Sequence, residues 1–373
     1  MGWSIRLFDV GGTAVRIHFT FFLLLAWIGA VHWMRGGPSE AIAGVLFIAI
    51  LFLCVVLHEF GHVFAARRYG IKTADVTLLP IGGVASLERM PEKPSQEIVV
   101  ALAGPAVNLV IALVLIIVLG ARFDLSQMAQ LEQAQSTLLG RVAAANVALL
   151  VFNLIPAFPM DGGRVLRALL AVPLGFTRAT RVAAGIGQGL AVVFAFFGLL
   201  GNPLLVLIAA FIFLAASGEA GYVQAREYMR GYLAGQIMIS EFQSLKPEST
   251  ADEAAQLLLR TTQQEFPVVD DAGTLRGLLT RNALIAGLRD DGGTTPVSRL
   301  MLENIPTVPQ NACLDNVFPT LQREPGVVGV VDAGRRLVGY ISAENLAELV
   351  MIHSSRSARG QQPAPAAPAG VRG

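Results

Sequence analysis

The sequence IAGVLFIAILFLCVVLHEFGHVFAA at residues 42–66 joins an apolar run of membrane length to an H-E-x-x-H motif. Residues 42–57 contain no charged side chain, and His58, Glu59 and His62 follow directly. On a helix the two imidazoles lie one turn apart on one face and can bind one zinc ion, while Glu59 can take a proton from zinc-bound water. Ionisable residues in an apolar helix are costly, so the pattern favours a functional site over a chance occurrence.

The composition places most of the 373-residue chain in a membrane. Hydrophobic residues make up 54% and charged residues 15% of the chain, and the mean hydropathy is +0.58. A net charge of +1 without a long Lys/Arg block excludes nucleic acid as an expected partner. The cysteines, Cys54 and Cys313, are too few for a disulfide framework or a cysteine zinc cluster.

Six stretches before residue 230 are apolar and long enough to cross a membrane, which takes roughly 20 residues. The first lacks a small-residue cleavage site followed by soluble sequence, so we expect it to be retained rather than removed as a signal peptide. The expected spans are approximately residues 15–34, 42–66, 97–120, 139–157, 180–200 and 203–222.

The basic residues that flank these spans predict the orientation, because Lys and Arg are enriched on the cytoplasmic side. With the N-terminus inside, the opposite loops carry only Arg35, Arg122 and Arg141. Both termini are therefore expected in the cytoplasm. The cytoplasmic segments then carry Arg6, Arg67, Arg68, Lys72, Arg89, Lys93, Arg164, Arg167, Arg178, Arg226 and Arg230.

A catalytic zinc ion generally takes three protein ligands, so a third ligand is expected outside the H-E-x-x-H motif. Asp161 is the candidate, because Pro156, Pro159 and the following glycines break a span there, and broken backbone at membrane depth is tolerated where it lines a polar cavity. The alternative for Asp161 is the N-cap of a helix over residues 162–171. The histidines not expected to bind metal are His18, His32 and His353.

Residues 73–88, TADVTLLPIGGVASLE, predict a β-hairpin around Gly82 and Gly83 rather than a span. A hairpin beside an active site can offer an edge strand to an extended substrate, because pairing of main chains recognises peptides with little regard to sequence. A plain amphipathic connector is the alternative.

The third span opens with the small residues Ala103, Gly104 and Pro105. Small residues permit close helix packing in a membrane, and packing is the simplest interpretation of this segment. Asn108, one turn further on, is the member of this group that can add a polar contact near the site.

The chain beyond about Met229 has mixed charge and alternates short strand-like and helix-like stretches, so it predicts a soluble α/β domain. Residues 266–284, FPVVDDAGTLRGLLTRNAL, and residues 327–346, VVGVVDAGRRLVGYISAENL, share one pattern: strand, Asp-containing turn, strand ending in Gly-x-x-[Thr/Ser], helix. Their period of about 62 residues indicates a tandem duplication. The Ala/Pro/Gly-rich tail is expected to be disordered.

The membrane part resembles the site-2 protease family of intramembrane zinc metalloproteases, in the order and spacing of its motifs. The C-terminal repeats resemble a tandem pair of CBS domains, which similar bacterial and archaeal members carry after the last span. The positions that match the protease family are His58, Glu59, His62, Gly82, Gly83, Ala103, Gly104, Pro105, Asn108, Asn153, Pro156, Pro159, Asp161 and Gly162.

The expected fold class is a polytopic α-helical membrane protein with about six spans and a membrane-associated β-hairpin, followed by an α/β tandem CBS pair. Its expected location is the prokaryotic inner or plasma membrane, as a multi-pass protein with its CBS domains in the cytoplasm. The expected domains are residues 1–230 for the protease, 236–290 and 297–353 for the two CBS domains, and 357–373 for the disordered tail.

The resemblance implies cleavage of a transmembrane helix of another protein near the cytoplasmic face, so a membrane-protein substrate and membrane lipid are the expected partners. One Zn²⁺ per chain would be bound by His58, His62 and Asp161, with Glu59 as general base. Support for substrate or for the oxyanion is expected from Asn108, Asn153, Gly82 and Gly83.

Tandem CBS domains commonly bind adenosine nucleotides, with a Thr or Ser and a following Asp at the ribose. Thr280 and Ser342 match the hydroxyl positions, whereas Ala283 and Asn345 stand where the Asp is expected. Two alternatives stay open: binding of ATP or another adenosine nucleotide, and a module that only packs or forms a homodimer.

A CBS-regulated metal-ion transporter is the main alternative function, with the same His, Glu and Asp side chains forming a transit site. It does not explain why Glu59 stands where a hydrolase needs its base, and the membrane part lacks the repeated halves expected of a transporter. An inactive scaffold is disfavoured by the intact H-E-x-x-H motif and Asp161. The sequence favours a protease modulated by its CBS pair.

Overall fold

The computed structural model describes residues 3–80, 82–87, 91, 93–118, 137–322 and 324–358, and it divides into two compact units. The first unit is Met1–Val223 and the second is Gln224–Gly373. The division falls inside helix α6, Pro203–Met229, seven residues before the predicted boundary at 230. Most of the predicted tail, 357–373, lies outside the described residues.

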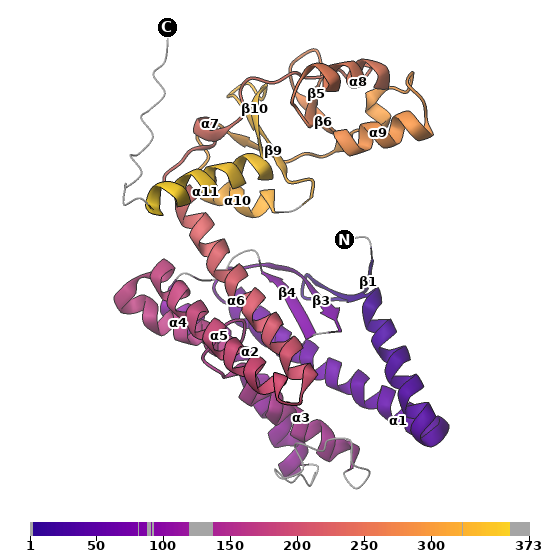
Figure 1. Cartoon of the computed structure of the whole chain (residues 1–373), viewed down its shortest axis with the longest axis vertical. Helices are drawn as coiled ribbons and strands as arrows, with labels where there is room; N and C mark the ends of the chain where they lie inside the picture. Colours follow the sequence, from indigo (N-terminus) through magenta and orange to yellow (C-terminus); the bar gives the residue numbers. More distant parts are fainter. Residues whose placement is uncertain are drawn as a thin grey trace. The chain divides into compact units, whose positions relative to one another are not determined.

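The first unit combines one four-stranded sheet with apolar helices (Figure 1). Its strands are β1 (Ser4–Val10), β2 (Thr13–His18), β3 (Thr73–Leu79) and β4 (Gly82–Leu87). Its helices are α1 (Phe19–Arg67), α2 (Pro94–Leu113), the π-helix η1 (Val114–Val118), α3 (Leu138–Asn153), α4 (Asp161–Leu174), α5 (Phe176–Leu199) and α6.

Helix α1 covers two of the predicted spans and folds back on itself between them (Figure 1). Gly37 has φ 79° and ψ −164°, a conformation that Gly adopts without a steric penalty, and Pro38 follows with no N–H to donate. Among the described helices, four are long and apolar enough to cross a membrane: α1, α2 with η1, α5 and α6. Since α3 has only 16 residues, the count of six spans remains a prediction.

Two predicted span boundaries were wrong. Helix α1 begins at Phe19 instead of residue 15, because Thr13–His18 forms β2, which pairs antiparallel with β1 and parallel with β3. Helix α3 ends at Asn153 instead of residue 157, since Pro156 and Pro159 cannot continue it. The β1–β2 hairpin was not predicted from the sequence.

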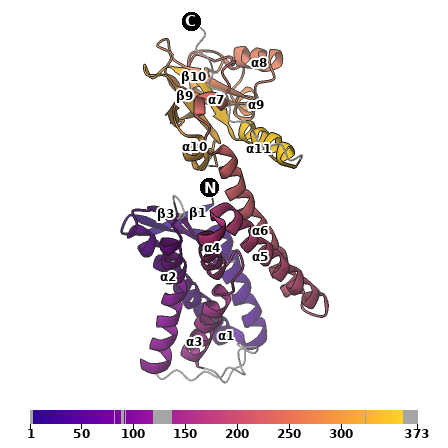
Figure 2. The same ribbon diagram turned by 90° about the vertical axis from the view of Figure 1, so that its left-hand side faces the viewer.

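The sheet has the order β1-β2-β3-β4, and Figure 2 shows it at one end of the helices of this unit. Strands β3 and β4 pair antiparallel, from Thr73 opposite Leu87 to Leu79 opposite Gly82, where the sequence predicts a hairpin. Strand β4 is therefore an edge strand, with one row of backbone groups left for a further strand.

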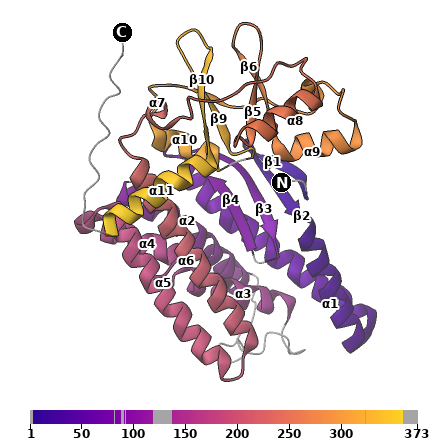
Figure 3. The same cartoon turned by 45° about the horizontal axis from the view of Figure 1, so that its top comes forward.

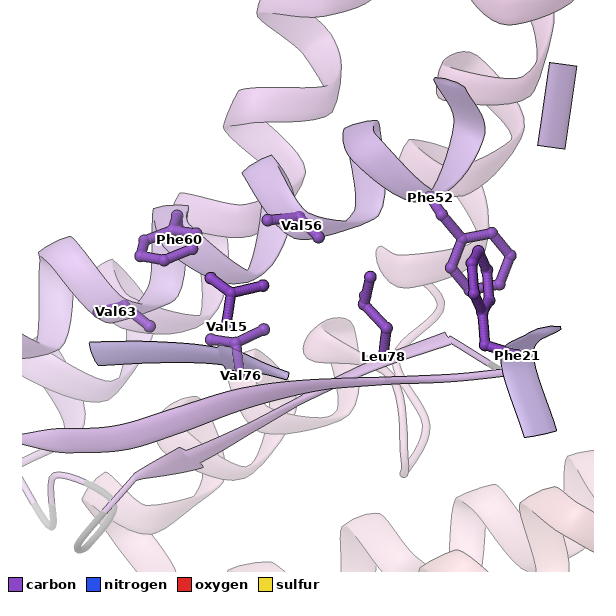
Figure 4. Packing of buried hydrophobic residues seen from close by; sticks show 8 residues of the cluster. All are labelled: Val15, Phe21, Phe52, Val56, Phe60, Val63, Val76 and Leu78. Carbon is purple, nitrogen blue, oxygen red and sulfur yellow. The ribbon is translucent and has the colours of Figure 1, made fainter. Parts of the chain in front are cut away.

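A hydrophobic core joins the sheet to the second limb of α1 (Figure 4). Phe52, Val56, Phe60 and Val63 form one stripe of the helix, and they pack with Val15, Val76 and Leu78 of the sheet and with Phe21 of the first limb. At 3.6 residues per turn, His58 and His62 lie roughly 135° around the helix from this stripe. Burial of the stripe therefore turns both histidines away from the sheet.

The second unit contains two three-stranded sheets, in the orders β5-β6-β7 and β10-β9-β8. The predicted repeats correspond to the hairpins β5–β6 and β9–β10, each followed by a helix (Figure 3). Its elements are α7 (Ala234–Ile237), α8 (Ala251–Arg260), β5 (Glu265–Val269), β6 (Leu275–Thr280), α9 (Arg281–Asp290), the 3-10 helix η3 (Val297–Arg299), β7 (Leu302–Glu303), β8 (Thr307–Pro309), α10 (Leu314–Leu321), β9 (Val327–Val331), β10 (Leu337–Ser342) and α11 (Ala343–Ala358).

The aspartates that the repeats share close the two hairpin turns. Asp270 accepts backbone N–H groups of Ala272 and Thr274, and Asp332 accepts the backbone N–H of Arg336. The backbone hydrogen bond from Thr274 holds the pKa of Asp270 below its ordinary value. Both aspartates are therefore structural turn residues.

The close approach of α1 to α2 gives a test of the helix packing in the first unit. A Cβ on Gly61 would lie 2.6 Å from the carbonyl oxygen of Ala103 and 3.0 Å from a methyl of Val107. We expect Gly61→Ala to lower the free energy of unfolding by about 1–3 kcal/mol, the usual cost of overpacking. Thermal unfolding in detergent, followed by tryptophan fluorescence, measures it. The control is Gly189→Ala on α5, where an added Cβ meets nothing within 4 Å. Equal melting temperatures for the two variants would contradict this packing.

Candidate metal centre

Three side chains from two helices converge inside the first unit. His58 and His62 come from α1, and Asp161 is the first residue of α4. The two imidazole Nε2 atoms are 3.1 Å apart, and each lies 3.2 Å from Oδ2 of Asp161. All three residues are buried, with exposed fractions of 6%, 3% and 5%. The structure therefore brings together the residues that the sequence predicts as ligands.

A backbone contact fixes the protonation of His62. Its Nδ1 lies 2.7 Å from the carbonyl oxygen of Val100 on α2, and a carbonyl can only accept, so Nδ1 carries the proton. In a neutral imidazole the other nitrogen then presents a lone pair. Histidines that bind metals usually make this kind of outer hydrogen bond.

The arrangement fits a zinc ion. Ligand atoms about 2.0–2.2 Å from zinc at tetrahedral angles lie roughly 3.3 Å from one another, and the three atoms here are 3.1–3.2 Å apart. Within the described part of the chain, Oδ2 of Asp161 is buried without a hydrogen-bond donor. A cation equidistant from the three atoms would satisfy the carboxylate and, with both imidazoles neutral, the lone pair of each Nε2.

Gly104 of α2 leaves the space that such an ion needs. A Cβ at this position would lie 2.3 Å from Nε2 of His62 and 2.7 Å from Nε2 of His58. Any larger residue would displace both nitrogens. Gly104 therefore has a direct place in the site, beyond the helix packing that the sequence analysis assigned to its segment.

Asp161 reaches the histidines because the chain is broken just before it. Residues 154–160 follow the end of α3 and contain no regular helix, and α4 begins at Asp161. The N-cap of α4 is Met160, so the N-cap alternative for Asp161 was wrong. Its other oxygen, Oδ1, lies 3.5 Å from a guanidinium nitrogen of Arg164, one turn along α4. From the sequence, Arg164 was interpreted only as one of the basic residues that predict the cytoplasmic side of the membrane part.

Glu59 lies between the metal ligands and the sheet. It is partly buried on α1, next to His58 in sequence, and a Cβ on Gly83 of β4 would lie 2.8 Å from its Cγ. Gly83 thus lets the edge strand lie directly against the predicted base. Gly82, at the start of β4, has φ 137° and open space around it.

The two predicted asparagines have different surroundings. Asn108 is fully buried on α2, one turn beyond Gly104, and neither of its amide atoms has a hydrogen-bond partner among the described residues. Asn153 is the last residue of α3 and is partly exposed. Their roles at the site remain predictions.

The two predicted nucleotide-site hydroxyls cap helices in the second unit. Thr280 accepts the backbone N–H of Ala283 at the start of α9, and Ser342 accepts that of Asn345 at the start of α11. Ser342 and Asn345 also line a cavity of about 720 Å³. Nucleotide binding there stays a prediction.

Comparisons with known proteins match both units. Residues 46–196 match peptidase family M50, and residues 234–290 match the CBS domain. A zinc metalloprotease of Methanocaldococcus jannaschii is 38% identical over 280 residues, which are 75% of this chain and 78% of that protein. A putative zinc metalloprotease of Mycobacterium tuberculosis, Rip3, is 27% identical, with 94% of this chain and 93% of that protein aligned. The solved structure of a site-2 protease from M. jannaschii is 40% identical and covers 58% of this chain and 95% of its own, with a TM-score of 0.45.

Gly104 supplies a test of the metal centre that leaves its ligands unchanged. We expect Gly104→Ala to reduce bound zinc from one ion per chain to well below one, because its Cβ would take the space between the histidine nitrogens. Metal analysis of the purified protein measures this, with Gly189→Ala as the matched control. Full zinc occupancy in Gly104→Ala would contradict the placement of the ion.

Proposed function

The chain belongs to peptidase family M50, the site-2 protease family of zinc metalloproteases, and we propose that His58, His62 and Asp161 hold its zinc while Glu59 is the general base. The enzyme is a zinc metalloendopeptidase of intramembrane proteolysis. The observation that carries the proposed site is the convergence of two histidine nitrogens and one buried carboxylate oxygen within 3.2 Å of each other.

The chemistry follows from what each side chain can do. Zinc in this site would act as a Lewis acid and lower the pKa of a coordinated water to about 7. Glu59, next to His58 on α1, would accept the proton of the attacking water and deliver it to the leaving amide nitrogen. The carbonyl of Val100 keeps the His62 ring in the tautomer that a metal ligand needs. Arg164 would hold Asp161 in place through its second oxygen.

Strand β4 is the proposed contact for the substrate. It is an edge strand, and Gly83 places it against Glu59. An extended peptide added to this edge would lie beside the base, with its carbonyls paired to backbone groups and not hidden in a helix. Asn108 and Asn153 are proposed to support the substrate or the oxyanion. The substrate is thus a membrane-protein segment that can unwind locally near the active site.

The orientation is also a proposal. Six spans with both termini in the cytoplasm of a prokaryotic cell agree with the basic residues of the sheet end of the first unit. There Arg67, at the end of α1, donates to the hydroxyl of Thr13 in β2 at 3.1 Å, and Arg6 lies on the adjacent β1. Lys and Arg of this kind mark the cytoplasmic face.

We propose that the second unit, called the CBS unit below, is regulatory, and that an adenosine ligand binds the cavity beside Ser342. The buried Oδ1 of Asn345 has no hydrogen-bond partner in the described part of the chain and can accept a ribose hydroxyl. Four carboxylates line the same cavity, and they disfavour a polyphosphate. They are Glu241, Glu265, Glu344 and Glu348. A homodimer through the CBS unit remains a prediction.

Glu59→Gln tests the proposed base. We expect this variant to keep its zinc and to lose at least about 10²-fold in cleavage rate, since Gln cannot take a proton. The chain is co-expressed with tagged single-span membrane proteins, including anti-sigma-type regulators, and shortened products are detected by blotting. Glu227→Gln, an exposed position on α6, is the matched control. Cleavage by Glu59→Gln at the control rate would contradict the role of Glu59, and zinc flux in vesicles without cleavage would favour the transporter.

The acidic cavity gives a second prediction. Burial and the nearby Glu344 raise the pKa of Glu265, so its charge is lost as pH falls toward that raised value. We expect ATP to bind more tightly at lower pH, and Glu265→Gln to tighten binding at neutral pH by about two- to fivefold. Calorimetric titration of the full chain in detergent measures both. The exposed Glu303→Gln, on β7, is the control, and an unchanged or weaker affinity in Glu265→Gln would contradict the repulsion.

A further inference from the structure

A charged residue lies fully buried two turns along α4 from Asp161. Arg167 is 1% exposed, and its guanidinium carbon lies 5.0 Å from the ring centre of Phe158 and 4.7 Å from that of Phe176. Nε donates to Glu97 of α2 at 2.7 Å, and Nη1 donates to Glu219 of α6 at 2.6 Å. We call Glu97, Arg167 and Glu219 the Arg167 cluster.

Stability alone does not account for this cluster. Removal of charges from water costs several kcal/mol per ion, and apolar residues of similar volume often give equal or greater stability. One oxygen of Glu97 is buried with no hydrogen-bond partner among the described residues, so the cluster is not fully satisfied either. A structure that retains such a cluster gains directional contacts that apolar packing does not provide.

Two of the three helices that form the Arg167 cluster also reach the metal centre, and the third leads to the second unit. Helix α4 begins with Asp161. In α2, Glu97 stands three residues before Val100, whose carbonyl accepts the proton of His62. Helix α6 continues from Glu219 past the end of the first unit to Met229, five residues before the CBS match begins at residue 234.

We propose that Glu219 is a positioning residue for the metal centre. Through Arg167 it holds α4 and α2 in the relative position that brings Asp161 and His62 to the ion. Helix α6, which leads to the CBS unit, is thereby coupled to the metal ligands through direct contacts. Glu219 of α6 contacts Arg167, which belongs to α4 and also contacts Glu97 of α2. This inference rests on the proposed metal site.

The test replaces Glu219, whose side chain is 32% exposed and is the most exposed of the Arg167 cluster. Glu219→Gln keeps the size of the side chain and removes its charge. The protein is loaded with Co²⁺ in place of zinc, because the visible absorption of cobalt reports the geometry of its ligands independently of activity. We expect a shifted cobalt spectrum and a kcat about 10- to 100-fold lower, with KM changed less than twofold, as a displaced catalytic group gives.

Two further variants make the result specific. Glu227→Gln removes a charge from the exposed Glu227–Arg230 pair of the same helix and should leave both the cobalt spectrum and kcat unchanged. Glu219→Asp keeps the charge but is shorter, so its spectrum and kcat should lie between those of wild type and Glu219→Gln. If Glu219→Gln does not fold, the Asp variant decides the matter by the same two measurements.

Two different results would contradict this proposal. A Glu219 variant with a lower melting temperature but a wild-type cobalt spectrum and kcat would show that the cluster only stabilises the fold, which overturns the coupling. A wild-type chain that takes up no cobalt or zinc would overturn the proposed metal site itself, and the coupling with it.

Discussion

The proposed activity depends on the close approach of two imidazole nitrogens and one carboxylate oxygen inside apolar helices, and the rest of the first unit holds these groups in place. Each Nε2 lies 3.2 Å from Oδ2 of Asp161, and in a neutral His62 imidazole that nitrogen carries a lone pair. Unprotonated imidazole nitrogens and a carboxylate oxygen repel at this distance, and burial removes the water that would screen them. A divalent cation resolves this conflict, and the surrounding elements hold the three groups in the position that needs one.

Packing on a different face of α1 sets this geometry. The stripe from Phe52 to Val63 is buried against the sheet (Figure 4) and fixes the rotation of α1. The histidines therefore face Val100 of α2 and Asp161 of α4. Gly61 and Gly104 let α2 approach closely enough for Val100 to reach His62. Ala85 of β4 packs against the same core. One set of apolar contacts therefore positions the proposed ligands, the proposed base and the proposed substrate edge together.

The sequence was informative where chemistry depends on local spacing. The H-E-x-x-H motif placed both histidines on one helix face, and the prolines before Asp161 marked the broken segment. It was less informative where contacts join distant elements. The β1–β2 hairpin was missed because its six-residue strand β2 runs straight into an apolar helix, so both belonged to one apolar stretch. Arg167 was counted as a cytoplasmic charge, since only the fold shows that Glu97 and Glu219 converge on it, 70 and 52 residues away. A signal was available, because Glu97 is the one charged residue of α2, and Glu219 closely follows the apolar run at residues 203–216 of α6.

The identity of the atoms bound to zinc tests the central claim most directly. Cys54 lies one turn before His58 on α1 and is buried, so a thiolate is a nearby alternative to the carboxylate. X-ray absorption at the zinc edge of the purified wild-type protein distinguishes the two. We expect nitrogen and oxygen atoms at about 2.0–2.2 Å, with the scattering pattern of two imidazoles. A sulfur atom at about 2.3 Å, or fewer than two imidazoles, would contradict a centre formed by His58, His62 and Asp161.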